Sequence, residues 1–165
     1  MEGIMALRTG HVGINVTDLD RSRRFYVELF GLEVLGESTE DGRRFAFLGN
    51  PDVRSDVFLD RLAITLWEQS SGTFSTGTPG LHHLAFHVES VTEVEAVRDR
   101  VQNLGVEMLH GGEIVPHSSD FDSGGFFFVD PDGVRLEVCA PAGVPTDRAV
   151  TEAAPSCGFF PPSAD

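Results

Sequence analysis

The chain has 165 residues, 41% of them apolar, and a formal charge of −14 from 26 acidic against 12 basic residues. That apolar content excludes a disordered chain, and the scarcity of Lys and Arg argues against nucleic acid as a partner. Because we find no signal peptide at the start and no apolar run of the roughly 18 residues that cross a bilayer, we expect a cytoplasmic protein without membrane contact.

The first half of the chain predicts a strand, a helix and further strands. Residues 10–16 alternate apolar and polar side chains, as a strand with one buried face does. Asp18 or Asp20 can cap the helix that follows, and Gly31 can end it. Two more strands are then expected, over residues 44–48 and 62–67.

The second half repeats this order. Residues 82–88 alternate in the same way, and Ser90 and Glu93 have the spacing of a capping box for a helix that stops before Gly105. Residues 130–133 read Asp-Pro-Asp-Gly, which is typical of a tight turn between two strands. The strands expected in this half cover residues 113–116, 125–129 and 134–139.

Each half therefore predicts a small α+β unit. Neither half alone can cover both faces of its sheet, so we expect the two to pack together. The sequence thus predicts a single domain over residues 1–142, with one module at about 8–70 and a second at about 80–142. We expect an irregular tail over residues 143–165, whose Phe159 and Phe160 are candidates for docking onto the body or a partner subunit.

Three residues of the repeat point to a metal ion. His83 follows His11 by 72 residues and occupies the same position in its half. Glu137 lies in the last expected strand, on the face opposite the apolar one. Two imidazoles and one carboxylate suit Fe(II), Mn(II), Ni(II), Co(II) or Zn(II) and leave positions for a substrate. Such a metal polarises a substrate oxygen, or activates dioxygen if it is iron.

Each of these residues also has an ordinary structural interpretation. A lone strand histidine is most often a core residue, and Arg135 is a partner for Glu137 on the same face. Cys139 shares that strand and fits a small buried thiol, while Cys139 and Cys157 together are too few for a disulfide framework. The matched positions of the two histidines favour the metal interpretation.

The motifs around these residues resemble those of the vicinal oxygen chelate superfamily, the glyoxalase, bleomycin resistance and extradiol dioxygenase family. They are His11–Val16 with Asp18-Leu19-Asp20 and Phe25-Tyr26, then Leu81–Phe86, then Phe128–Glu137. The resemblance covers residues 8–142 and implies paired βαβββ modules that form a cupped mixed sheet around a metal and ligand cavity. It implies His11, His83 and Glu137 as metal ligands, and a homodimer is common for this architecture.

The resemblance also identifies candidates for polar help in catalysis. Glyoxalase I-like members have a glutamate as fourth ligand, and the 72-residue offset from Glu137 leads to Thr65, a poor ligand. Glu68 follows nearby, on the other face of the strand unless a bulge intervenes. His117 is similar to an extradiol dioxygenase histidine, although that family's tyrosine is Phe127 here and its upstream histidine is missing. His117, Glu68 and Thr65 are kept as catalytic candidates.

Two functions of different kinds follow from these features. The first is a divalent-metal-dependent enzyme that chelates vicinal oxygens of a small metabolite, with lyase, isomerase, epimerase or oxygenase chemistry. The alternative is a metal-free resistance protein of the bleomycin-binding type, which sequesters an antibiotic. The intact His, His and Glu set favours the enzyme, whereas the charge of −14 suits a cationic drug and supports the alternative.

Overall fold

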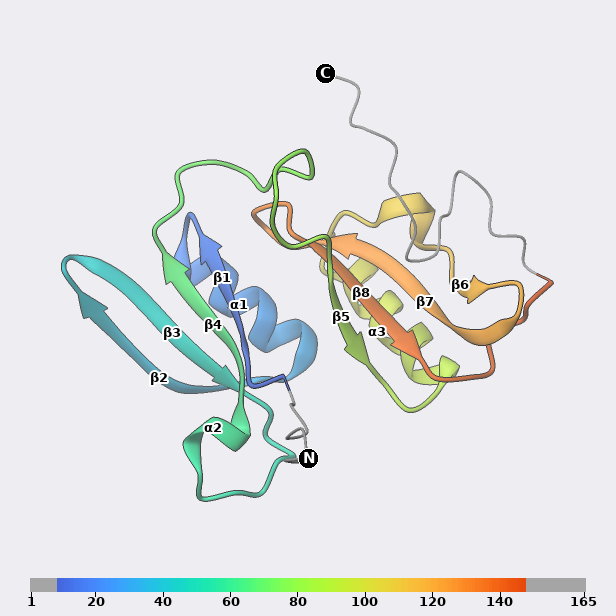
Figure 1. Cartoon of the computed structure of the whole chain (residues 1–165), viewed down its shortest axis with the longest axis horizontal. Helices are drawn as coiled ribbons and strands as arrows, with labels where there is room; N and C mark the ends of the chain where they lie inside the picture. Colours follow the sequence, from blue (N-terminus) through green and yellow to red (C-terminus); the bar gives the residue numbers. More distant parts are fainter. Residues whose placement is uncertain (1–8, 148–165) are drawn as a thin grey trace, which may run out of the picture. The chain divides into compact units, whose positions relative to one another are not determined.

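The computed structural model describes residues 9–147, which divide after Gly72 into two compact units. Figure 1 shows the elements of each unit. The first unit contains β1 (Val12–Val16), α1 (Leu19–Phe30), β2 (Glu33–Glu40), β3 (Arg43–Gly49), α2 (Phe58–Arg61) and β4 (Leu62–Glu68). The second contains β5 (Leu84–His87), α3 (Val91–Asn103), the 3-10 turn η1 (Leu109–Gly112), β6 (Val115–Ser118), β7 (Phe121–Val129) and β8 (Arg135–Ala140). Among the described residues, no helix is long and apolar enough to cross a membrane.

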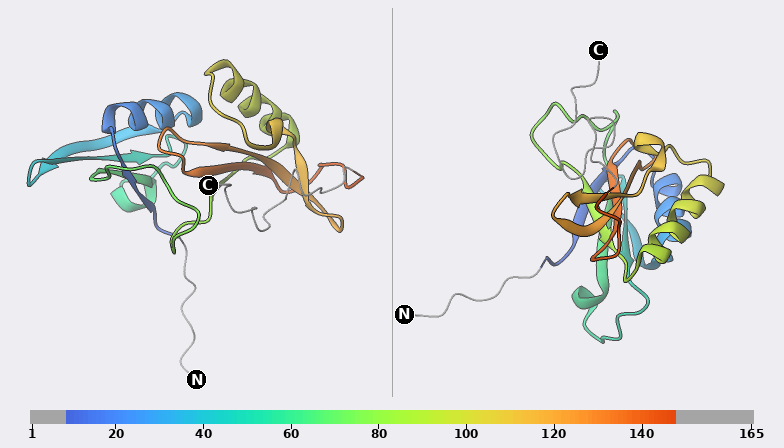
Figure 2. Two further views of the ribbon diagram at one scale, coloured as in Figure 1. Left: turned by 90° about the horizontal axis from the view of Figure 1, so that it is seen from above. Right: turned by 90° about the vertical axis from the view of Figure 1, so that its right-hand side faces the viewer.

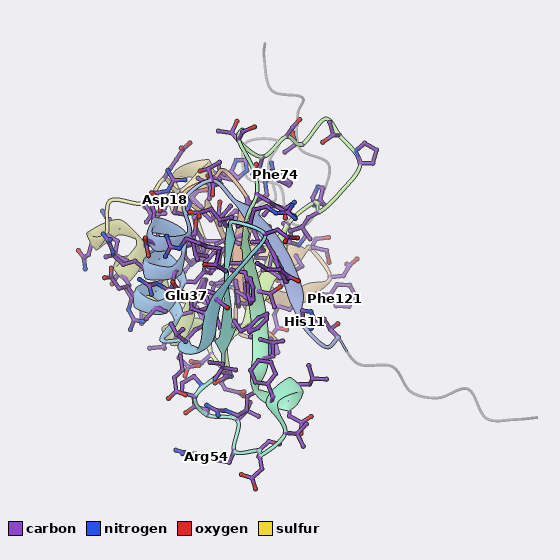
Figure 3. The ribbon with its side chains drawn as sticks, turned by 90° about the vertical axis from the view of Figure 1, so that its left-hand side faces the viewer. His11, Asp18, Glu37, Arg54, Phe74 and Phe121 are labelled. Carbon is purple, nitrogen blue, oxygen red and sulfur yellow. The ribbon has the colours of Figure 1, made fainter. Side chains whose placement is uncertain are left out.

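The first unit is a mixed four-stranded sheet with a helix on one face. Its strand order is β1-β4-β3-β2, with β1 parallel to β4 and the other neighbours antiparallel. Helix α1 lies against this sheet (Figure 2). Asp18 caps the helix by accepting a hydrogen bond from the Arg21 amide at 2.9 Å, and Figure 3 shows this residue at the start of α1. The helix ends at Gly31, which adopts the left-handed conformation with φ of 68°.

The second unit has the same construction. Its strand order is β5-β8-β7-β6, with β5 parallel to β8, and α3 lies against one face of the sheet (Figure 2). Ser90 and Glu93 form the predicted capping box at the start of α3. The predicted α+β fold of paired βαβββ modules is therefore confirmed, as two mixed four-stranded sheets.

The pairing registers demonstrate the internal repeat at residue level. Gly13 on β1 lies opposite Thr65 on β4, and Ala85 on β5 lies opposite Glu137 on β8. Both members of the second pair are 72 residues after their counterparts. The register thus makes Thr65 the positional equivalent of Glu137, as the sequence offset predicts.

The buried apolar side chains lie between each sheet and its helix. In the first unit they include Ile14, Val16, Ile64 and Leu66 from the sheet, with Leu19, Tyr26 and Leu29 from α1. In the second they include Phe126, Phe128, Leu136 and Val138 from the sheet, with Val94 and Val101 from α3. Since strand side chains alternate between faces, residues such as Thr65 and Glu137 point to the side opposite the helices.

Several element boundaries differ from the sequence predictions. Strand β2 was not predicted because it is an edge strand whose residues are largely exposed, which leaves no apolar alternation to detect. Asp41 and Gly42, both with positive φ, form the tight turn between β2 and β3. Strand β6 begins two residues later than expected, so His117 belongs to a strand rather than a loop.

The structure describes the predicted turn and the start of the predicted tail, but not the remainder of the tail. The turn at Asp130–Gly133 is confirmed, with the Gly133 amide donating to the Asp130 carbonyl at 3.0 Å. Residues 143–147 contain no helix or strand. The rest of the predicted tail, including Phe159, Phe160 and Cys157, lies outside the described residues. The closure of the two sheets around one cavity stays a prediction.

Candidate metal site in the second unit

Glu137 is a carboxylate placed in the interior of a sheet. It lies on β8, between β5 and β7, and its side chain is only 1% exposed. Taking an ionised carboxylate out of water is costly unless it is paired and hydrogen-bonded. The residue therefore requires partners on the sheet face to which it points.

Two histidines supply those partners, one at each carboxylate oxygen. His83, which immediately precedes β5, places Nε2 at 3.3 Å from Oε2 of Glu137. His117 on β6 places Nε2 at 2.7 Å from Oε1. The two imidazoles are 20% and 26% exposed, so each is mostly sheltered but still reaches solvent. Glu137 is thus held between two nitrogen donors of the kind that bind metals.

A second layer of contacts orients both imidazole rings. Nδ1 of His83 lies 2.7 Å from Nδ1 of His82, and Nδ1 of His117 lies 3.0 Å from Oγ of Ser123. In both histidines Nδ1 is held by an outer partner while Nε2 faces the carboxylate. Metal-binding histidines show this same division of roles between their two nitrogens. Burial, with help from the neighbouring charges of His83 and Arg135, lowers the pKa of His82 below 6.5, which favours its neutral, hydrogen-bond-accepting form.

Cys139 adds sulfur to the cluster. It lies two residues after Glu137 on β8 and therefore shares its face of the sheet, and its thiol is half-buried. The ligand atoms of His117, Glu137 and Cys139 all lie within 4.8 Å of one another. Hydrogen bonds with Cys139 and with Glu137 raise the pKa of His117 to about 10 from 6.5, against the effect of desolvation. The raised pKa favours the protonated imidazole, which pairs with the Glu137 carboxylate.

Two glycines occupy β7, the strand between those that carry His117 and Glu137. Strand β7 lies between β6 and β8, with Gly124 opposite Pro116 and Gly125 opposite Cys139. A Cβ atom at Gly124 would lie 2.7 Å from the Cα of Pro116, and one at Gly125 would lie 2.7 Å from the Cα of Cys139. Gly125 shares the sheet face of Cys139 and Glu137, so at this position the intervening strand carries no side chain on that face.

The aromatic ring of Phe127 packs beside Glu137 and contacts His83. Phe127 on β7 lies opposite Glu137 and is buried. Its ring meets that of His83 edge to face, with centroids 5.8 Å apart. This contact limits the orientations that the His83 imidazole can adopt.

The donor set fits a divalent metal ion. It combines imidazole nitrogens, a carboxylate and a thiol, which are the groups that bind Zn(II), Co(II), Ni(II), Fe(II) or Mn(II) in varying combinations. Each carboxylate oxygen of Glu137 faces a histidine nitrogen. A metal ion bound between either pair would take the place of the proton that the nitrogen and the oxygen now share. Among the predicted site residues, the structure brings His83, His117 and Glu137 together.

The other predicted site residues belong to the first unit. His11 is exposed and immediately precedes β1, as His83 precedes β5 (Figure 3). The Thr65 hydroxyl accepts a hydrogen bond from the Trp67 indole at 2.9 Å. A carboxylate oxygen of Glu68 accepts one from the Leu19 amide at 2.8 Å, at the start of α1. Glu68 thus points to the helix side of its sheet, as the strand spacing predicts.

The sequence alone does not indicate the whole of this cluster. Its pattern fits a small buried thiol at Cys139. The signal for Cys139 was present, since its two-residue spacing from Glu137 places both on one face. Nothing in the sequence indicates Ser123, because its role depends on how β6 and β7 pair.

The fold and this cluster define a class of small α+β proteins built from two βαβββ modules, with potential ligand-binding residues on the sheet face opposite the helix. The chain belongs to the Glyoxalase/Bleomycin resistance protein/Dioxygenase superfamily, whose family model matches residues 8–138.

Named relatives and solved structures are consistent with this assignment. A Brassica oleracea var. gemmifera protein described as "Putative lactoylglutathione lyase" is 30% identical over 134 residues; the match covers 78% of this chain and 42% of that protein's length. A glyoxylase/bleomycin resistance protein/dioxygenase domain from Frankia sp. EAN1pec has a TM-score of 0.67 at 24% identity, covering 83% of this chain and 93% of that one. The fosfomycin resistance protein FosX from Listeria monocytogenes, in complex with Mn(II) and sulfate, has a TM-score of 0.58 at 23% identity, covering 82% and 93% respectively. At 24% and 23% identity, the likeness to these two structures shows only that this chain shares their fold.

Proposed function

We propose that the chain is a divalent-metal-dependent enzyme acting on a small oxygenated metabolite, with His83 and Glu137 among the metal ligands. The observation that carries the proposal is the buried Glu137 carboxylate, whose two oxygens face the Nε2 atoms of His83 and His117. The Mn(II) complex of FosX and the name of the Brassica relative support metal-dependent enzyme chemistry within the superfamily. His11 is the proposed third ligand, on the strength of its repeat equivalence to His83.

A bound metal of this kind polarises a substrate oxygen and stabilises an oxyanion or enolate. The chain's own residues would then hold the substrate and move its proton. His117 is the proposed acid–base residue, because Ser123 holds its Nδ1 while Nε2 faces the site. The Thr65 hydroxyl accepts a hydrogen bond from Trp67, and the Glu68 carboxylate accepts one from the Leu19 amide. The catalytic roles of Thr65 and Glu68 therefore stay predictions, with less structural support than that of His117. A homodimer and a cytoplasmic location also stay predictions.

The test is metal analysis of the full chain purified without a histidine tag, after loading in turn with Fe(II), Mn(II), Ni(II), Co(II) and Zn(II). We expect about one ion per chain, because the ligand cluster contains a single buried carboxylate, Glu137. Glu137→Gln keeps the size of the side chain and removes its charge, so it should weaken metal affinity by more than about 100-fold, beyond what outer partners of a metal site cost. His83→Ala should weaken it as well.

Matched controls come from the same unit. Asp130→Asn alters another buried carboxylate, whose Oδ1 accepts hydrogen bonds from the Asp132 and Val134 amides in the turn before β8. His87→Ala removes an exposed histidine four residues beyond His83, roughly 13 Å away at the rise of a strand. Both variants should retain the metal. Failure of the wild-type chain to bind any of the five ions would overturn the proposal and favour the metal-free antibiotic-binding alternative.

A further inference from the structure

The proposed function uses one side of Glu137, where Oε2 faces His83. The other oxygen has donors of its own, since His117 Nε2 lies 2.7 Å from Oε1 and the Cys139 sulfur lies within the same cluster. All three residues come from β6 and β8 of the second unit. The superfamily resemblance names neither His117 nor Cys139 as a ligand, so this side of the carboxylate is unassigned.

The spacing of these donors suits a single ion. Metal–nitrogen, metal–oxygen and metal–sulfur bonds of about 2.0–2.3 Å place the donors of a tetrahedral site about 3.3–3.8 Å apart. The three ligand atoms already lie within 4.8 Å of one another. The separations of the three donors are therefore already close to those of a tetrahedral site.

The surroundings keep these donors ordered and accessible to an ion. Ser123 holds the outer nitrogen of His117, and Glu137 is fixed inside the sheet at 1% exposure. Cys139 is half-buried, and its β7 neighbour Gly125 has no side chain that could cover the thiol. The Cys139 sulfur lies 3.7 Å from the Phe86 carbonyl oxygen, to which the thiol donates, and it also contacts His117 within the cluster.

We infer that His117, Glu137 and Cys139 form a thiolate-containing metal-ligand set within the second unit, in which Nε2 of His117 binds the ion instead of serving as the acid–base group. This inference rests on the proposed role of Glu137 as a ligand and adds a sulfur donor to it. Thiolate is a soft ligand that favours Zn(II) and Co(II), whereas Mn(II) prefers oxygen donors. Binding requires a thiolate and a neutral imidazole, so the Cys139 sulfur and Nε2 of His117 each release a proton to solvent as their bonds to the metal form.

The test is a titration of the metal-free, chemically reduced full chain with Co(II), followed by absorption spectroscopy. A thiolate bound to Co(II) produces an intense sulfur-to-metal charge-transfer band in the near ultraviolet, which nitrogen and oxygen ligands do not produce. We expect this band in the wild-type chain and its loss in Cys139→Ser. The matched control is Cys157→Ser, which removes the other cysteine of the chain and should leave the band unchanged.

Affinity measurements give a second readout that a merely structural thiol would not affect. Cys139→Ser should weaken Zn(II) binding by more than about tenfold, the lower end of the loss caused by removing an outer partner. Mn(II) binding should change much less, because serine replaces a donor that Mn(II) does not prefer. His117→Asn should weaken Zn(II) binding as well. Circular dichroism spectra of both variants establish that they are folded, and Cys139→Ala replaces Cys139→Ser if the latter is not.

The outcomes separate this inference from the proposed function. If Co(II) binds at about one ion per chain without the charge-transfer band, or if the band persists in Cys139→Ser, the thiolate ligand is overturned while the metal site at Glu137 stands. If neither Co(II) nor any of the other four ions binds, the proposed function is overturned and the thiolate set with it.

Discussion

The two units present equivalent sheet faces with different chemistry. Thr65 and Glu137 occupy the same register position, at 2% and 1% exposure, and Trp67 corresponds to Cys139 two residues later. In the first unit the threonine hydroxyl is satisfied by the indole of Trp67, whose ring packs against Phe45 with centroids 5.1 Å apart. In the second unit the same backbone frame carries the buried carboxylate with its histidines.

This difference shows that two copies of one fold can carry a structural residue in one copy and a chemically active residue at the matched position of the other. A buried hydroxyl needs one neutral hydrogen bond, which a side chain two residues away provides locally. A buried carboxylate needs charged or strongly donating partners, and here they come from two other segments of the unit, at His83 and His117. Thr65 is therefore satisfied by one neutral local contact, whereas the second unit's face concentrates groups that bind and transfer protons.

The largest expected effect is a loss of stability when a matched core residue is truncated. It tests whether the helix-side cores of the two units contribute equally to the free energy of unfolding. Ile64 and Leu136 are matched residues, 72 apart, buried in the core on the helix side of each sheet. Ile64→Ala and Leu136→Ala should each lower the free energy of unfolding by about 2–5 kcal/mol, through lost burial and the cavity left behind. Urea denaturation followed by circular dichroism measures both.

Milder substitutions at the same sites serve as controls. Ile64→Val should cost about 0.5–1.5 kcal/mol, and Leu136→Met less than about 1.5 kcal/mol, because most of the volume is kept. Trp67 is the single tryptophan of the chain, so its fluorescence follows the first unit separately. A loss below about 1 kcal/mol for either alanine variant would contradict the equivalence of the two cores.

A smaller effect is expected at the N-terminal caps of the two helices, which are built differently. Asp18 caps α1 through the Arg21 amide alone, whereas Ser90 and Glu93 cap α3 reciprocally. Asp18→Ala and Ser90→Ala should each destabilise the chain by about 1 kcal/mol, with the larger loss at Ser90 because the capping box is lost. Ser90→Thr, which keeps the hydroxyl, should be nearly neutral in the same urea experiment. Equal stability of Ser90→Ala and wild type would contradict a role for the capping box.

The smallest effect concerns charges around α1. Asp20 binds Arg44 through both oxygens, at 2.9 and 3.0 Å, and lies 3.1 Å from Arg23. The Arg44 hydrogen bond lowers the pKa of the Asp20 carboxyl below 3.8. Because the folded-state pKa is depressed, this ion pair stabilises the fold above pH 3.8, and the contribution is lost as the pH falls through the folded-state pKa.

An NMR titration of the Asp20 carboxyl carbon measures this pKa directly. Arg44→Gln should raise the pKa toward 3.8, and the effect should weaken with added salt because the groups are exposed. Arg43→Gln is the control, since the Arg43 guanidinium contacts Gln69 instead. An unchanged Asp20 pKa in Arg44→Gln would show that the ion pair does not form in solution.

Local features of the fold could be predicted from the sequence. The sequence predicts the cap at Ser90, the turn at Asp130–Gly133 and a cap at Asp18 or Asp20, of which the structure selects Asp18, because each depends on hydrogen bonds within a few residues of chain. Strand β2 and the start of β6 were missed, since an edge strand is defined by its neighbour and not by its own pattern. The 72-residue repeat was visible because duplicated strands keep their alternation, and the registers confirm it.

The sequence by itself determined the family, the paired α+β architecture and the sheet face to which Glu137 points. Only the tertiary structure decided which groups meet that carboxylate. His117 is 20 residues before Glu137 on a strand that is not its neighbour, and Gly125 on the intervening β7 carries no side chain on the face that they share. Such a contact depends on strand order and on the absence of side chains between two strands, and neither is encoded in the periodicity of a single segment.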